Sequence, residues 1–91
     1  MKIVAVCGMG IGTSILLKMN IEKVLDSLDI EGDVEAADIG VAKGFGRTAD
    51  IMLTSQDLAE EIGEVEATII VIDNFFDLEE IESKLSTAIN P

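Results

Sequence analysis

Short aliphatic runs alternate along this chain with segments of helical periodicity, and this alternation restricts the fold more than any other feature. Four runs have the length and composition of strands: 3–6, 34–39, 50–54 and 67–72. Three segments show apolar residues at helical spacing or capping residues at their ends: 13–28, 56–62 and 77–89. Between 39 and 50, Gly44 and Gly46 predict a loop or a short irregular helix.

Strands that are separated by helices connect through crossovers, which leave the strands parallel. We therefore expect an α/β fold, a three-layer open sheet of four parallel strands with helices on both faces, flavodoxin-like or Rossmann-like. The 91 residues contain neither an internal repeat nor a Pro/Ser-rich linker, so residues 1–91 are predicted to form one domain. Ligands of such sheets bind beyond the carboxyl ends of the strands. The loop after the first strand is the first place to seek a site.

Composition excludes several kinds of chemistry. Because the chain has no His, it can form no phosphohistidine of its own, perform no His-based acid–base catalysis and hold no metal through His. Because it has one Cys, it can form neither an intrachain disulfide nor a metal site built from several thiolates. We expect neither a metal nor a cofactor. The net charge of −12 opposes binding to nucleic acid and to anionic membranes. No run approaches the roughly 18 apolar residues of a membrane span and no signal peptide is evident, so a soluble, cytoplasmic protein is expected.

The charges are unevenly distributed along the sequence. Residues 1–21 contain Lys2 and Lys18 and no acidic residue, and the first acid is Glu22. This segment could tolerate an anion. The alternative is that a buried strand and a buried helix face simply contain few charges.

A cysteine and a glycine-rich loop occupy the end of the first strand. After Cys7 come Gly8, Met9, Gly10, Ile11, Gly12, Thr13 and Ser14. Glycines at alternate positions let backbone N–H groups turn inward, and with a helix N-terminus they form a nest for phosphate. The same field favours a thiolate, which would make Cys7 a nucleophile. We predict Cys7 as the catalytic residue and 8–14 as the phosphate-binding loop. Otherwise Cys7 is a small buried residue and the glycines only allow close packing.

Three other phosphate sites fit the sequence less well. A dinucleotide fingerprint that begins at Gly8 needs a glycine where Thr13 stands. A Walker loop needs Gly-Lys-Ser/Thr, which is absent. A receiver domain of similar topology needs acidic residues after the first and third strands, where we place Cys7 and Thr54-Ser55.

A Cys-based phosphatase or arsenate reductase is the stronger competitor. These enzymes use a Cys-x5-Arg-Ser/Thr loop, in which the Arg stabilises the charge of the transferring phosphoryl group. Here the sixth residue after Cys7 is Thr13, and the only Arg in the chain is Arg47. A reductase also needs further thiols. A nucleophile in an anion nest without this machinery suits a carrier that keeps its phosphoryl group until an acceptor arrives.

The stretch from Ile3 to Ser14, Ile-Val-Ala-Val-Cys-Gly-Met-Gly-Ile-Gly-Thr-Ser, continuing into Lys18-Met19, resembles a known family. It is similar to the B component (enzyme IIB) of the bacterial phosphoenolpyruvate-dependent sugar phosphotransferase system, and looks most like the ascorbate-type branch of the lactose/ascorbate group. The resemblance implies a phosphotransferase in which Cys7 becomes phosphocysteine and 8–14 hold its phosphate. It further implies a phosphohistidine donor on the IIA component and an acceptor sugar in the membrane IIC component, which alone brings the protein to the membrane. A small phosphatase and a non-enzymatic regulatory module of the same fold remain alternatives.

A few other segments carry weaker expectations. Lys18 is predicted to be a solvated lysine, with contact to phosphate or a partner as the alternative. The basic loop 43–47, with its exposed-looking Phe45, follows the second strand and is expected on the active edge of the sheet. The aromatic pair in 73–77 is expected to cap the core, and the acidic run 60–66 to be a solvated face.

Overall fold

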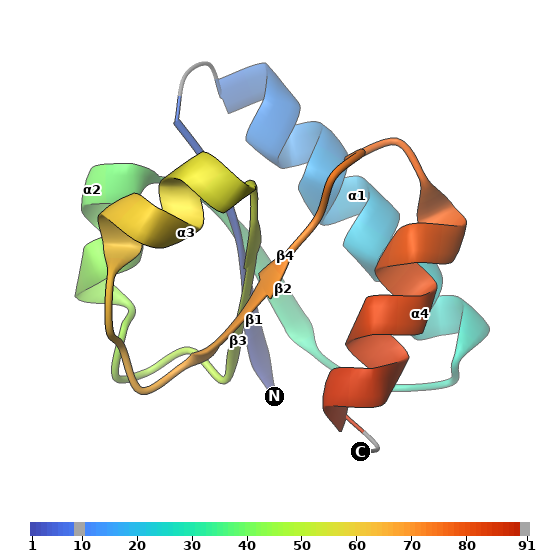
Figure 1. The fold of residues 1–91 in the computed structure, drawn as a ribbon. Coiled ribbons are helices and arrows are strands. Elements are labelled where there is room, and N and C mark those ends of the chain that lie inside the picture. Colours follow the sequence, from blue (N-terminus) through green and yellow to red (C-terminus); the bar gives the residue numbers. More distant parts are fainter. Residues whose placement is uncertain (9–10, 90–91) are drawn as a thin grey trace.

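In the computed structural model, residues 1–8 and 11–89 are described, although the side chains of 11–14 are not. Over this part of the chain, strands and helices alternate as expected (Figure 1). The elements are β1 (Lys2–Cys7), α1 (Ile11–Ser27), β2 (Asp33–Asp38), α2 (Ile39–Gly44), β3 (Ile51–Thr54), α3 (Gln56–Ile62), β4 (Thr68–Val71) and α4 (Leu78–Ile89). Within the described residues, no helix has the length and apolar character needed to cross a membrane.

The four strands of the described residues form one parallel sheet in the order β2-β1-β3-β4. Helices α1 and α4 cover one face of the sheet, and α2 and α3 cover the other (Figure 1). This three-layer arrangement confirms the predicted fold class, and the strand order is that of the flavodoxin-like fold. The chain leaves β1 toward β2 on one side and later reaches β3 on the other. Strand β1 is therefore the switch point of the sheet.

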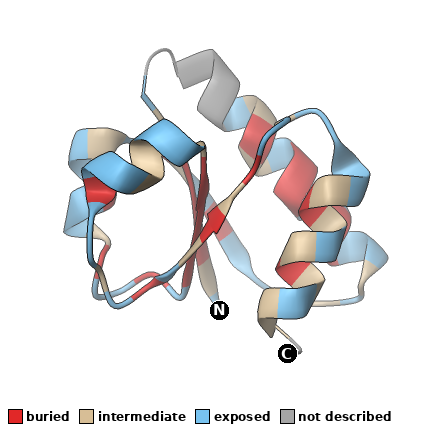
Figure 2. Ribbon diagram, in the orientation of Figure 1, coloured by how far each residue is buried: buried red, intermediate tan, exposed pale blue. Residues whose placement is uncertain are grey.

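The apolar side chains of β1 explain why it lies in the centre. Ile3 and Ala5 point into a cluster under α1 and α4, and Val4 and Val6 point into a second cluster under α2 and α3. All four are completely buried, and Figure 2 shows the buried residues concentrated along the central strands and the inner faces of the helices. A strand that is apolar on both faces is stable only between two layers.

Two local differences from the sequence prediction concern the helices. Helix α1 begins at Ile11, so Ile11, Gly12, Thr13 and Ser14 belong to its first turn instead of a loop. Residues 39–44 form a regular helix, because the carboxylate of Asp38 accepts a hydrogen bond from the Val41 N–H (2.9 Å) and caps it. The predicted helix 56–62 is confirmed with the same bounds.

Gly63 ends α3 in a backbone conformation that only glycine adopts readily, with φ of 73° and ψ of −148°. A methyl group on Gly63 would meet no atom within 4 Å, so the backbone alone sets the cost of a substitution. We expect Gly63→Ala to lower the free energy of unfolding by about 1–3 kcal/mol, measured by urea denaturation. Gly44→Ala is the matched control, because its space is also open and its φ is not positive. Equal losses in the two variants would contradict this account.

Candidate functional site

Cys7 is the last residue of the central strand. It pairs in register with Asp38, the last residue of β2, and its side chain is half-buried. By the alternation of strand side chains, Cys7 lies on the same face as Ile3 and Ala5, the face that α1 covers. The thiol is therefore at the carboxyl end of β1, the switch point of the sheet. Ligands of such folds bind at this place.

Helix α1 begins four positions after Cys7 and runs for 17 residues, with no acidic residue in its first turn. A helix N-terminus presents unpaired N–H groups and a partial positive charge, which together attract anions. Gly8 is exposed beside Cys7, and a Cβ on it would lie 3.0 Å from the Leu58 side chain. Met9 and Gly10 lie outside the described residues, as do the side chains of 11–14, so the predicted phosphate contacts of 8–14 stay a prediction.

Two residues that the sequence did not indicate lie at this end of the sheet. Asp38 is brought beside Cys7 by strand register, although 1–21 contain no acid. Thr54 ends β3, is completely buried, and donates a hydrogen bond from Oγ1 to the Val6 carbonyl oxygen (3.1 Å). Neither neighbour could be found from local pattern, because strand register joins residues that are far apart in sequence.

The segment between β4 and α4 lies at the same edge and is held by Glu80. The Glu80 carboxylate accepts hydrogen bonds from the backbone N–H groups of Asp73 (2.8 Å) and Asn74 (3.0 Å). Lys84 donates a third (2.8 Å). The Asp73 N–H, then Lys84 and then Asn74 stabilise the charged form and lower the pKa of Glu80 from 4.5 to about 2, against the opposing effect of burial.

This loop is also tied to α1, and it separates the two aromatic residues. The Asn20 side-chain amide donates to the Phe75 carbonyl (2.8 Å), and the Phe75 ring packs on the core under α1 and α4. Phe76 is 70% exposed. The expectation that the aromatic pair caps the core is thus confirmed for Phe75 and wrong for Phe76, because the turn at 74–77 directs consecutive side chains to opposite sides.

We expect Glu80→Gln to lower the free energy of unfolding at pH 7 by about 1–2 kcal/mol, because a charged acceptor of three hydrogen bonds is replaced by a neutral one. Since folding lowers the pKa of Glu80, its contribution is fully present above pH 4.5 and is lost as the pH falls toward about 2. The difference between wild type and Glu80→Gln should narrow over that range in denaturation curves. Glu79→Gln, at the exposed neighbouring position, is the control, and a difference that is independent of pH would refute this assignment.

The basic loop 43–47 does not lie on the active edge as expected. Helix α2 starts beside Cys7 and carries the chain about 9 Å back along the sheet. The Gly46 carbonyl accepts a hydrogen bond from the Ala67 N–H (3.2 Å), just before β4, and Lys2 Nζ lies 4.2 Å from the centre of the Phe45 ring. These contacts place the loop at the amino end of the strands. Phe45 is half-buried, and Arg47 lines a hollow with Glu64 and Glu66.

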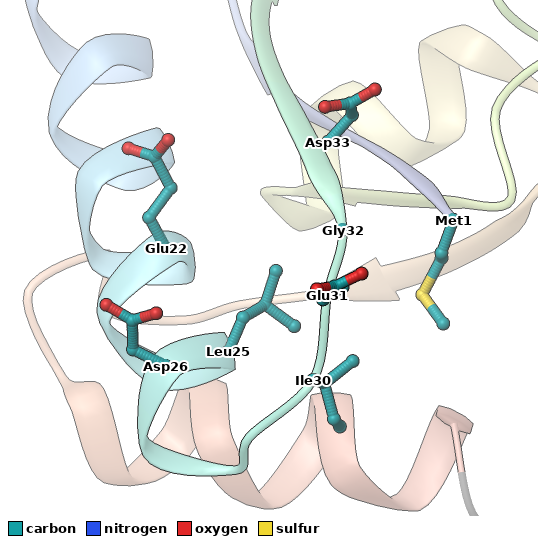
Figure 3. Close-up of a pocket in the computed structure, with 8 residues that line it drawn as sticks. All are labelled: Met1, Glu22, Leu25, Asp26, Ile30, Glu31, Gly32 and Asp33. Carbon is teal, nitrogen blue, oxygen red and sulfur yellow. The ribbon is translucent and has the colours of Figure 1, made fainter.

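A second hollow lies at the amino end, on the other face of the sheet. Figure 3 shows it between the C-terminal half of α1 and the start of β2, with four carboxylate residues among those that line it: Glu22, Asp26, Glu31 and Asp33. Within the described residues, no group of three or more acidic or thiol side chains is placed to hold a metal ion. The negative charge makes this hollow unsuitable for phosphate. The carboxyl edge around Cys7 is therefore the candidate site.

A third hollow crosses the exposed edge of β2. Ile15 and Met19 of α1 line it from one layer and Val41 of α2 from the other, each between 44% and 52% exposed. Lys18 lies in the same hollow and is half-buried, so it is less solvated than the sequence suggested. An apolar surface thus lies along the exposed edge of β2.

Comparison with known proteins gives matches to one kind of protein, and two of them cover nearly the whole chain. Residues 2–87 match the family model described as "PTS system, Lactose/Cellobiose specific IIB subunit". The "Ascorbate-specific PTS system EIIB component" of Mycoplasma pneumoniae is 38% identical over 87 residues, covering 94% of this chain and 92% of that protein. The protein of the same name from Escherichia coli O157:H7 is 36% identical over 61 residues, 67% of this chain and 60% of that one.

The fold is also found among solved structures. The lactose-specific IIB component domain from Streptococcus pneumoniae matches with a TM-score of 0.62 and 16% sequence identity, covering 98% of this chain and 94% of that chain. At this identity the similarity concerns the fold alone. The names of these proteins share the IIB component and differ in the sugar.

Proposed function

Because the chain belongs to the lactose/cellobiose-specific IIB family of the sugar phosphotransferase system, we propose that it is a phosphoryl carrier whose acceptor is Cys7. The donor is a phosphohistidine on the IIA component, and the acceptor is a sugar bound by the membrane IIC component. The protein acts in the cytoplasm and reaches the membrane only through IIC. The observation that carries this proposal is the position of Cys7, at the switch point of the sheet and four residues before the N-terminus of α1.

The proposed chemistry consists of two displacements at phosphorus. The Cys7 thiolate attacks the phosphorus of the phosphohistidine, an S–P bond forms, and the N–P bond breaks to leave imidazole on the donor. A sugar hydroxyl oxygen then attacks the same phosphorus, the S–P bond breaks, and the thiolate is restored while the hydroxyl proton passes to a base or to water. The amide groups at the start of α1 and in 8–14 would hold the phosphate between the two steps.

The position of Arg47 favours a carrier over a phosphatase. Cys-based phosphatases need an Arg against the transferring phosphoryl group. The only Arg of the sequence lies in the hollow with Glu64 and Glu66 at the amino end of the sheet, opposite the edge that holds Cys7. Hydrolysis of the thiophosphate therefore lacks its usual electrostatic assistance, and the phosphoryl group would persist until the sugar arrives.

Labelling tests this proposal directly. With ³²P-phosphoenolpyruvate, the general phosphotransferase components and an ascorbate-type IIA, we expect the protein to become labelled. Adding membranes that contain the matching IIC and ascorbate should transfer the label to the sugar. Ascorbate is chosen because it is named in the relatives of higher sequence identity, 38% and 36% against 16% for the lactose-specific domain. Labelling without transfer to any sugar would favour a regulatory module, and rapid release of inorganic phosphate would favour a phosphatase.

A further inference from the structure

A side chain adds a link between β1 and β3 beyond the last pair of their register. With β2, strand β1 pairs in register as far as Cys7–Asp38, but with β3 its register ends at Ala5–Leu53. Beyond that point the Thr54 hydroxyl donates to the Val6 carbonyl oxygen over 3.1 Å. On its β3 side, the peptide that precedes Cys7 is thus held by Thr54.

Thr54 is itself firmly held. It is completely buried at the end of a strand whose other residues are apolar, Ile51, Met52 and Leu53. Its carbonyl accepts a hydrogen bond from the Ile72 N–H (2.8 Å), which joins it to the chain beyond β4. A buried hydroxyl is unfavourable unless it is hydrogen-bonded. The polar residue at this position is therefore explained by the bond that it makes to Val6.

We propose that Thr54 is a positioning residue for Cys7. This inference rests on the proposed role of Cys7 as phosphoryl acceptor. The peptide bond is planar, so fixing the Val6 carbonyl also fixes the N–H and Cα of Cys7. Without the hydroxyl, the Val6–Cys7 peptide can move more on the side that faces β3. The distance between the Cys7 thiol and the N-terminus of α1 is then no longer fixed. Displacements of about 1 Å can slow a positioned reaction by up to about a hundredfold.

Two substitutions distinguish the effect of the Thr54 hydroxyl from the effect of the side chain's shape. Thr54→Val keeps the branched shape and removes the donor, whereas Thr54→Ser keeps the donor and removes a methyl group. We expect Thr54→Val to slow phosphorylation of Cys7 by phosphorylated IIA about tenfold or more, and to displace the pH–rate profile of Cys7 alkylation by iodoacetamide. Thr54→Ser should restore both. Ile81→Val, at a completely buried position on the inner face of α4, is the control for lost stability.

Each outcome decides the question. The proposal is overturned if Thr54→Val alkylates with the wild-type rate and pH profile, if Thr54→Ser is as slow as Thr54→Val, or if Ile81→Val slows the reaction equally. Alkylation needs no phosphorylated partner. If no IIA phosphorylates the wild-type protein, the proposed function fails, and the alkylation profiles still decide whether Thr54 positions the thiol.

Discussion

Replacement of Cys7 by serine is expected to abolish phosphoryl transfer, lowering the rate of labelling by at least about a thousandfold. Serine is a close steric substitute for cysteine, but at neutral pH its hydroxyl is un-ionised and a far weaker nucleophile. The sequence contains no His and no other Cys that could replace it. Labelled protein is measured after incubation with ³²P-phosphoenolpyruvate and phosphorylated IIA.

The control for the Cys7→Ser variant is a measurement showing that it still folds. Cys7 is half-buried at the end of a strand, so the serine variant should keep the circular dichroism spectrum and nearly the wild-type unfolding midpoint. If the Cys7→Ser variant still becomes labelled, peptide mapping should examine Thr13 and Ser14, the nearest hydroxyl residues in the proposed loop. A folded Cys7→Ser protein that labels as fast as wild type would refute the assignment of the acceptor.

Leu85→Ala is expected to lower the free energy of unfolding by about 2–5 kcal/mol, the usual cost of a cavity in a packed core. Leu85 is completely buried on the inner face of α4, in the cluster that also holds Leu17 and Ile21 of α1. A chain of 91 residues has a total stability of only about 5–14 kcal/mol. The variant should therefore unfold at a much lower urea concentration.

Leu78→Ala is the matched control on the same helix. Leu78 is 40% exposed at the first turn of α4, so its truncation leaves no closed cavity. We expect a loss of no more than about 1 kcal/mol. If both variants lost the same stability, burial on the inner face of α4 would not be the cause.

The parts of the fold that could be predicted are those in which local signals agree. Helix α3 has the predicted bounds. Gly63 ends it with the positive φ that only glycine adopts easily, and Ser55 occupies the N-cap position, although its side chain makes no capping hydrogen bond. Strand β1 was predicted because four consecutive aliphatic residues before a glycine cluster suit a strand between two layers. Asp77 was predicted to begin the last helix, and its carboxylate does accept hydrogen bonds from the Glu79 and Glu80 N–H groups.

The errors concern relations across the sheet. The sequence shows that 43–47 follow the second strand, but the place to which six helical residues carry the chain depends on contacts with Lys2 and with Ala67, which precedes β4. The absence of acids from 1–21 indicated that this segment could tolerate an anion, but it gave no sign that strand register places Asp38 beside Cys7. Thr54 looked like the ordinary end of a strand. Its importance depends on a contact with Val6, 48 residues earlier in the chain.

The central position of β1 also affects how the protein folds. Because β1 precedes β3 by 48 residues, a chain leaving the ribosome can pair β1 with β2 long before its other edge finds a partner. Until then, that edge is an aliphatic strand with unpaired N–H and C=O groups, the kind of edge that promotes aggregation. Pairing of such distant segments is slow. A nascent chain that ends before Thr54 thus carries the thiol without the neighbour that fixes it, and protection of Cys7 should appear only when the third strand docks.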